Sequence, residues 1–231
     1  MSARILILRP EPGASVTAGR ARAAGLDPVA APLFTIRPVD WDPPDPDDFD
    51  AVLLTSANAA RHGGTRFIHL PCYTVGDASG AAARLAGYGD IRIGPSDGAA
   101  AAGLLAAAGA HHVLHLCGRD HVEVSAPGLS FERRLVYTAE PVRDLPEPAR
   151  AALAQGALVL LHSAAAATLF GALAGERGAL RIASISPAVA AAAGEGWAAS
   201  AVSGAPRDEA LLELAVQLCQ TGSTGETGNG D

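Results

Sequence analysis

The sequence repeats one pattern: a short run of large apolar residues, then a turn of small or polar residues, then an alanine-rich helical stretch. The apolar runs are residues 5–8, 51–54, 72–75, 113–117, 158–161 and 182–185. Helical stretches follow most of them, at residues 15–24, 57–62, 79–86, 164–174 and 188–193. Short unbroken apolar strands that alternate with helices are typical of parallel sheets covered on both faces. The pattern therefore predicts an α/β protein.

Two extended, proline-flanked segments, residues 32–39 and 137–148, interrupt this rhythm. Proline disfavours the helical conformation at the residue before it, so both segments are predicted to be connectors. Because they lie far apart in the chain, we expect two three-layer parallel-sheet domains, one inserted in the other. The expected boundaries are 1–35 plus 141–220 for the discontinuous α/β domain and 38–137 for the inserted α/β domain. Residues 221–231 are rich in Gly, Thr and Ser, and are expected to form a disordered tail.

The charged residues exclude several classes of protein. All 17 cationic side chains are arginine and the chain contains no lysine. This excludes phosphate-loop nucleotidases, pyridoxal enzymes and Schiff-base aldolases, whose chemistry requires a lysine amine. The net charge of −7 also argues against a nucleic-acid partner, because neutralising phosphates requires a basic surface.

The cysteines and the apolar runs bear on the cellular compartment. Cys72, Cys117 and Cys219 are odd in number, far apart and without a CxxC pair, so neither a disulfide framework nor a cysteine zinc site is expected. Residue 1 leads directly into the first apolar run, and no uninterrupted apolar stretch of about 20 residues occurs. We expect a cytoplasmic protein that does not bind membranes. Nothing indicates a coiled coil or a large exposed apolar face, so a monomer is expected.

Hydrogen-bond donors gather where the apolar runs end. These residues are Arg9, Thr55, Ser56, Gly76, Gly118, Arg119, Ser163 and Ser186. In open parallel sheets, ligands bind beyond the carboxyl ends of the strands, where helix N-termini point their free N–H groups. Arginines, hydroxyls and such N–H groups suit carboxylate or phosphate ligands. The alternative is that the Ser and Thr side chains serve only as helix N-caps.

Other motifs indicate a chemistry less clearly. Residues 76–80 lack the spacing of a dinucleotide-binding fingerprint. His111, His115 and Cys117 could share one face of a strand and bind a metal, but no acidic ligand accompanies them at a helical spacing. Neutral histidines that are simply buried or solvated are the more common case. Ser163 follows a histidine, yet the GxSxG turn and an evident aspartate partner of a hydrolase are absent. We therefore expect no metal and no cofactor.

Several short motifs follow one another in a distinctive order. They are Leu8-Arg9-Pro10, Pro32-Leu33, Thr55-Ser56-Ala57-Asn58-Ala59, Val75-Gly76-Asp77-Ala78-Ser79, Leu116-Cys117-Gly118-Arg119, Val136-Tyr137, Leu161-His162-Ser163 and Ile185-Ser186-Pro187. In this order and spacing the chain resembles the uroporphyrinogen-III synthase family, from residue 4 to about residue 218. The resemblance implies two domains, each a parallel sheet flanked by helices, joined by a two-stranded linker, with the active site in the cleft.

The resemblance also implies an activity. The family cyclises hydroxymethylbilane, a linear tetrapyrrole with eight carboxylates, to uroporphyrinogen III, with loss of water, inversion of ring D and no cofactor. It implies that this chain is a hydro-lyase (EC 4.2.1.75) of heme and porphyrin biosynthesis. Tyr137 matches the family's candidate catalytic tyrosine. The implied substrate-binding residues are Arg9, Thr55, Ser56, Asn58, Gly76, Ser79, Gly118, Arg119, Ser163 and Ser186.

One position departs from the family pattern. After the Ile-Ser-Pro stretch the family commonly carries a hydroxyl residue, whereas this chain has Ala188 and Val189. That contact is then lost or supplied by Ser186. Two other functions therefore stay open: a non-catalytic two-lobed protein that binds a small anion, and a regulator of the same fold that has lost the chemistry. The residue at position 189 is the feature that favours the regulator.

Overall fold

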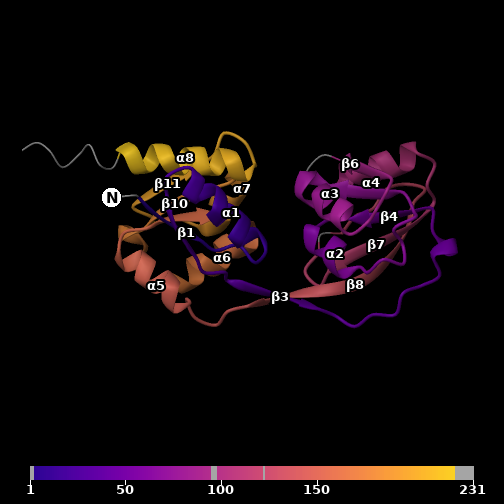
Figure 1. The fold of residues 1–231 in the computed structure, drawn as a ribbon, viewed down its shortest axis with the longest axis horizontal. Helices are drawn as coiled ribbons and strands as arrows, with labels where there is room; N and C mark the ends of the chain where they lie inside the picture. Colours follow the sequence, from indigo (N-terminus) through magenta and orange to yellow (C-terminus); the bar gives the residue numbers. More distant parts are fainter. Residues whose placement is uncertain (1–2, 95–97, 122, 222–231) are drawn as a thin grey trace, which may run out of the picture. The chain divides into compact units, whose positions relative to one another are not determined.

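A computed structural model describes residues 3–94, 98–121 and 123–221 of the chain, so residues 222–231 of the expected tail lie outside the described part. The chain folds into two compact units. Unit 1 comprises the residues up to Thr35 and those from Pro141 onward, and unit 2 is Ile36–Glu140. In Figure 1, unit 1 accordingly carries the colours of both chain ends, indigo and orange to yellow. The predicted insertion of one domain in the other is confirmed.

Unit 1 is built on a five-stranded sheet in the order β11-β10-β9-β1-β2, parallel throughout. Its strands are β1 (Arg4–Ile7), β2 (Asp27–Ala30), β9 (Leu158–Leu161), β10 (Arg181–Ser184) and β11 (Ala199–Val202). Its helices are α1 (Gly13–Ala23), α5 (Glu147–Ala154), α6 (Ala164–Leu173), α7 (Pro187–Ala193) and α8 (Asp208–Thr221). The inner strand β9 is buried along its whole length, as a strand covered on both faces should be.

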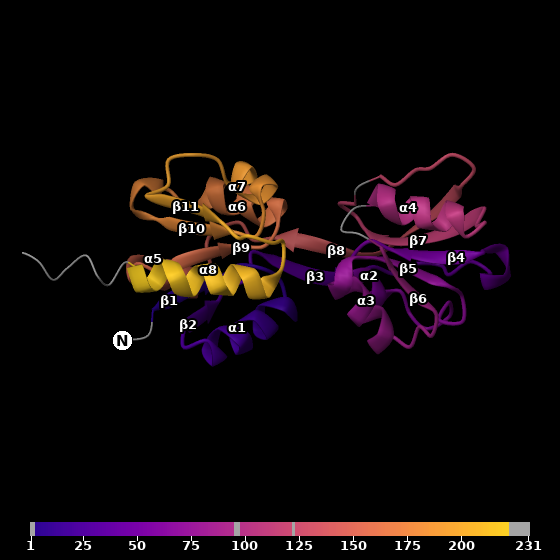
Figure 2. The same cartoon turned by 90° about the horizontal axis from the view of Figure 1, so that it is seen from above.

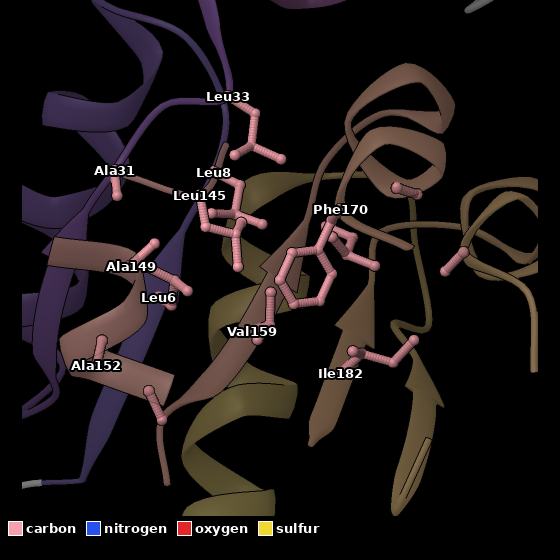
Figure 3. Packing of buried hydrophobic residues seen from close by; sticks show 14 of the residues in the cluster. Leu6, Leu8, Ala31, Leu33, Leu145, Ala149, Ala152, Val159, Phe170 and Ile182 are labelled. Atoms are coloured by element: carbon pink, nitrogen blue, oxygen red, sulfur yellow. The ribbon is translucent and has the colours of Figure 1, made fainter. Parts of the chain in front are cut away.

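Alternate residues of these strands supply two separate cores. Leu6, Val159 and Ile182 pack with Phe170 of α6 and with α5 and α7 on one face (Figure 3). Ile5, Ile7 and Leu160 face the other way and pack with α1 and α8. Successive side chains of a strand point to opposite faces, so a continuous apolar run fills both cores at once. This is why the apolar runs of the sequence do not alternate with polar residues.

Unit 2 is built on a six-stranded sheet in the order β3-β8-β7-β4-β5-β6. Its strands are β3 (Phe34–Pro38), β4 (Ala51–Leu54), β5 (Cys72–Val75), β6 (Ile91–Gly94), β7 (His112–Gly118) and β8 (Ser130–Pro141). Helices α2 (Ala57–His62) and α3 (Gly76–Leu85) cover one face, and α4 (Gly98–Ala107) covers the other (Figure 2). The α/β class with two parallel-sheet domains is confirmed.

The two predicted connectors are regular strands. β3 and β8 are neighbours in the sheet and both cross the boundary between the units, so they form the two-stranded linker. Val39 N–H donates to Val136 O at 3.1 Å and Val142 N–H donates to Leu33 O at 2.9 Å, which makes the pair antiparallel. β8 begins at Ser130, well before the expected start at residue 137. Its first half carries charged residues and is only half-buried, so it lacks the apolar run that marks the other strands.

In the part of the chain that the structure describes, no helix combines the length and the apolar character needed to cross a bilayer.

Candidate functional site

The carboxyl end of β4 presents two adjacent hydroxyl groups. Ser56 has an extended backbone, and its Oγ accepts the N–H of Ala59 at 3.1 Å, so it caps the N-terminus of α2. Thr55 Oγ1 lies 3.1 Å from Nε2 of His115, which is on the neighbouring strand β7. The two hydroxyls therefore have different partners, although they belong to consecutive residues.

A β-bulge decides where the Tyr137 side chain points. Along β7 and β8 the register pairs Cys117 with Leu135 but Gly118 with Tyr137, so Val136 is the extra residue. A bulge of this kind breaks the strict alternation of faces. Val136 and Tyr137 consequently both pack on the α2 face of the sheet. Without the bulge, Tyr137 would be expected on the α4 face, away from the Ser56 hydroxyl.

The Tyr137 phenol meets Ser56 at the strand end. The two hydroxyl oxygens are 2.9 Å apart, and the ring of His62 lies 6.2 Å from the Tyr137 ring, centroid to centroid. Burial raises the pKa of Tyr137, and the hydrogen bond with Ser56 only partly opposes this effect. The phenol is therefore protonated at neutral pH and can act as a hydrogen-bond donor.

Gly118 allows the tyrosine ring to come close to the end of β7. A Cβ atom at position 118 would lie 2.5 Å from Cζ of Tyr137, a distance that real Cβ contacts do not show. The next residue, Arg119, donates its backbone N–H to Tyr137 O at 3.2 Å. Its side chain is exposed and forms no ion pair with the residues that the structure describes. Arg119 is thus an unneutralised cation whose backbone is paired with Tyr137.

The remaining predicted residues of unit 2 lie on α2 and α3. Asn58 Oδ1 accepts from Arg61 at 2.8 Å. Gly76 begins α3 with a positive φ of 73°, and no side chain caps this helix. Its first-turn N–H groups therefore have no side-chain acceptor of the usual capping type. Ser79 is only 4% exposed, so it lies largely in the interior of unit 2.

In unit 1, the predicted serines cap helices. Ser163 Oγ accepts the N–H of Ala166 at 3.3 Å and begins α6, and Ser186 Oγ accepts the N–H of Val189 at 3.4 Å and begins α7. Their side chains thus take the N-cap role that was the alternative interpretation. Each still marks a helix N-terminus at the carboxyl end of a parallel strand, a position that favours anions.

Arg9 joins a buried cluster around Asp208, the first residue of α8. Asp208 accepts hydrogen bonds from His162 Nε2 at 2.9 Å, Thr17 at 2.8 Å and Arg20 at 2.9 Å, and Arg9 Nη1 lies 3.5 Å from it. Burial alone would raise the pKa of Asp208, but these hydrogen bonds outweigh it and hold that pKa well below its ordinary value. The charge of Arg9 is therefore already balanced inside unit 1.

This cluster corrects one sequence-based argument. His162 does have an aspartate partner, but Asp208 lies 46 positions further along the chain and no local pattern marks it. A Ser-His-Asp hydrolase site still does not result, because His162 bonds Asp208 through Nε2 while its Nδ1 has no hydrogen-bond partner among the described residues, so Ser163 is not bonded to it. His115, weighed above as a possible metal ligand, is a buried histidine that bonds a hydroxyl. The described residues contain no group of three or more His, Cys, Asp or Glu side chains placed to share a metal ion.

The fold and these residues define a class of protein: two α/β units whose parallel strands end in hydroxyls, arginines and helix N-termini. The family profile described as Uroporphyrinogen-III synthase HemD matches residues 15–213. The chain belongs to this family, and the resemblance noted from its motifs is confirmed.

Solved structures of similar fold carry the same family name. Uroporphyrinogen-III synthetase from Helicobacter pylori has a TM-score of 0.67 and 17% sequence identity, covering 94% of this chain and 100% of its own. A mutant uroporphyrinogen III synthase from Thermus thermophilus has a TM-score of 0.50 and 16% identity, with coverage of 94% and 100%. At these identities the likeness shows the fold. A search among curated proteins found no match.

Proposed function

We propose that the protein is a uroporphyrinogen-III synthase, which cyclises hydroxymethylbilane to uroporphyrinogen III. Membership of the family over residues 15–213 supports this proposal. The observation that carries it is the half-buried Tyr137 phenol, which lies 2.9 Å from the Ser56 hydroxyl at the carboxyl end of β4. We propose further that the enzyme is a cytoplasmic monomer that uses no metal and no organic cofactor.

The reaction needs orientation more than chemical activation. Loss of the ring A hydroxyl gives an azafulvene electrophile, and ring D attacks it through its substituted carbon to form a spiro intermediate. This intermediate fragments and recloses with ring D inverted. Free hydroxymethylbilane closes in water without inversion, so the enzyme must mainly hold the substrate in the folded conformation that allows the inverting attack.

Tyr137 is proposed to assist departure of the hydroxyl. Ser56 Oγ accepts the N–H of Ala59, so its own proton is free to point at the Tyr137 oxygen. The phenol proton is then available to the leaving hydroxyl of the substrate. Because burial raises the pKa of Tyr137, we assign it hydrogen-bond donation and not full proton transfer at neutral pH.

The substrate carboxylates are proposed to bind at the strand ends. Arg119 is the strongest candidate, since its guanidinium is exposed and forms no ion pair with any described residue. The uncapped N-terminus of α3 at Gly76 offers backbone N–H groups. Ser163 and Ser186 are proposed to contribute through the N-termini of α6 and α7. Arg9 is the weaker candidate because Asp208 already balances its charge.

The test is an isomer analysis. Purified protein is supplied with freshly generated hydroxymethylbilane, and the oxidised product is separated into type I and type III uroporphyrin. We expect the type III isomer. If only the spontaneous type I isomer forms, the enzyme assignment is refuted, and a non-catalytic binding or regulatory protein of this fold remains.

A Tyr137→Phe variant tests the role of the phenol separately. Loss of one hydrogen bond to a group that develops charge is expected to slow type III formation by about tenfold to a hundredfold. Full type III formation by this variant would refute the role of Tyr137 and leave the family assignment intact.

A further inference from the structure

The interior of unit 2 contains a histidine with one satisfied and one unsatisfied nitrogen. His115 on β7 is 0% exposed, and its Nε2 lies 3.1 Å from Thr55 Oγ1. Its Nδ1 is buried and has no hydrogen-bond partner among the described residues. On the same face, Val113 and Leu53 are apolar, whereas Arg133 lies opposite His115 on β8 and the ring of His121 lies 5.9 Å from that of His115, centroid to centroid.

The contacts of the ring identify its tautomer. Burial lowers the pKa of His115 to about 4, with His121 and Arg133 acting in the same direction, so the ring is neutral at pH 7. A neutral imidazole carries one N–H and one bare nitrogen. A buried N–H without an acceptor costs more than a bare lone pair without a donor. The proton therefore belongs on Nε2, where it is donated to Thr55 Oγ1.

This assignment fixes the direction of the Thr55 hydroxyl. The oxygen of Thr55 accepts from His115, so its own proton must be donated elsewhere. None of the described residues accepts that proton, and Thr55 is partly exposed at the carboxyl end of β4. The hydrogen bond from His115 thus fixes the orientation of the Thr55 hydroxyl, whose own proton is available to a ligand. A carboxylate is the kind of ligand group that such a donor would bind.

We propose that His115 is a positioning residue that holds the Thr55 hydroxyl as a donor to a substrate carboxylate. The inference rests on the proposed function, because the carboxylate is that of the linear tetrapyrrole. His115 does not contact the substrate and acts through Thr55. A purely structural role explains its position poorly, since an apolar side chain there would avoid leaving a buried nitrogen unpaired.

The test is a double-mutant cycle with type III formation as the readout. Thr55→Val should raise KM for hydroxymethylbilane about tenfold, with kcat changed less than about twofold, since a hydrogen bond to a charged group is lost. His115→Phe should raise KM by a similar factor. The variant with both substitutions should be no worse than Thr55→Val alone. His115→Gln, which keeps a donor, should recover part of the loss.

A matched control separates positioning from packing. Val113→Ala disturbs the same face of β7 without touching Thr55, and should lower stability while leaving KM unchanged. If His115→Phe raises KM as strongly in the Thr55→Val background as in the wild type, the positioning role is overturned. The same holds if Val113→Ala raises KM as much as His115→Phe does.

A tautomer measurement distinguishes failure of this inference from failure of the proposed function. Nitrogen-15 NMR of the histidine rings should show the proton of His115 on Nε2. A proton on Nδ1 overturns the positioning role, even in an active enzyme. A wild-type protein that forms only the type I isomer refutes the proposed function, and with it the substrate carboxylate assigned to Thr55.

Discussion

At the scale of single residues, the site depends on how closely the backbone at Gly118 approaches the Tyr137 ring. Gly118 gives that ring the space it occupies, since a Cβ atom at position 118 would lie 2.8 Å from its hydroxyl oxygen. The backbone of Gly118 belongs to a strand and cannot move away easily. The ring would have to shift instead, and the hydrogen bond to Ser56 would be lost.

We therefore predict that Gly118→Ala slows type III formation about as much as Tyr137→Phe does, by roughly tenfold to a hundredfold. The measurement is the isomer analysis, accompanied by thermal unfolding. Gly103→Ala is the matched control, because a Cβ atom at position 103 of α4 meets nothing within 4 Å. That variant should be as active as wild type and slightly more stable. Normal activity of Gly118→Ala would show that the ring tolerates the shift.

The buried His115 predicts how stability depends on pH. Its pKa of about 4 in the folded state lies below the ordinary value of 6.5, so the unfolded chain binds the proton more readily. The contribution of His115 to the free energy of unfolding is therefore fully present above pH 6.5. It is lost as the pH drops toward 4, which lowers the free energy of unfolding by about 3 kcal/mol. Urea unfolding at a series of pH values should show this fall in wild type and a smaller one in His115→Phe. An equal fall in both would contradict the prediction.

At the scale of elements, Asp208 connects pieces of unit 1 that are distant in the sequence. It belongs to α8, and its partners Thr17 and Arg20 are on α1 while His162 follows β9. The side chains of Asp208 and His162 are 9% and 4% exposed. Removing the charge of a buried acceptor leaves several donors poorly paired.

Asp208→Asn is predicted to lower the free energy of unfolding by about 3 kcal/mol. Glu209→Gln is the control, since Glu209 is 58% exposed and pairs only at the surface with Arg20, so it should cost less than about 1 kcal/mol. Denaturant unfolding of both variants checks the difference. Equal losses would mean that burial of the cluster contributes nothing.

The elements also show where sequence reasoning succeeds and where it stops. β4 and β9 are fully buried strands, so their apolar runs identify them and place Ser56 and Ser163 at their ends. β8 is predicted only in part because its charged first half resembles no buried strand. The bulge that turns Tyr137 toward Ser56 depends on pairing between strands, which a single strand's composition does not encode. The partners of Asp208 are likewise a product of the tertiary fold.

At the scale of the whole molecule, the absence of lysine means that reagents specific for amines and reagents specific for arginine should affect the protein differently. With 17 arginines and no lysine, the chain offers amine reagents only its amino terminus. We predict that acylation with an N-hydroxysuccinimide ester leaves the isomer ratio unchanged, whereas the arginine reagent phenylglyoxal inhibits type III formation.

Arg119 is expected to be the arginine whose modification inhibits, because it is exposed and forms no ion pair with the described residues. An Arg119→Gln variant should bind substrate more weakly and should lose little further activity to phenylglyoxal. Arg84→Gln, on the far end of α3, is the control and should stay sensitive. Inhibition of Arg119→Gln to the same extent as wild type would assign the effect to another arginine.

The insertion of unit 2 has a consequence for synthesis on the ribosome. β1 lies inside its sheet between β2 and β9, and Ile5 pairs with Leu158. At about 5–20 residues per second, the nascent chain carries an apolar β1 with an open edge for roughly 8–30 s before β9 is made. Unit 2 is complete before then and can fold within that interval. An unpaired apolar strand edge is a site of aggregation, so β1 is the strand of unit 1 most in need of a chaperone during synthesis.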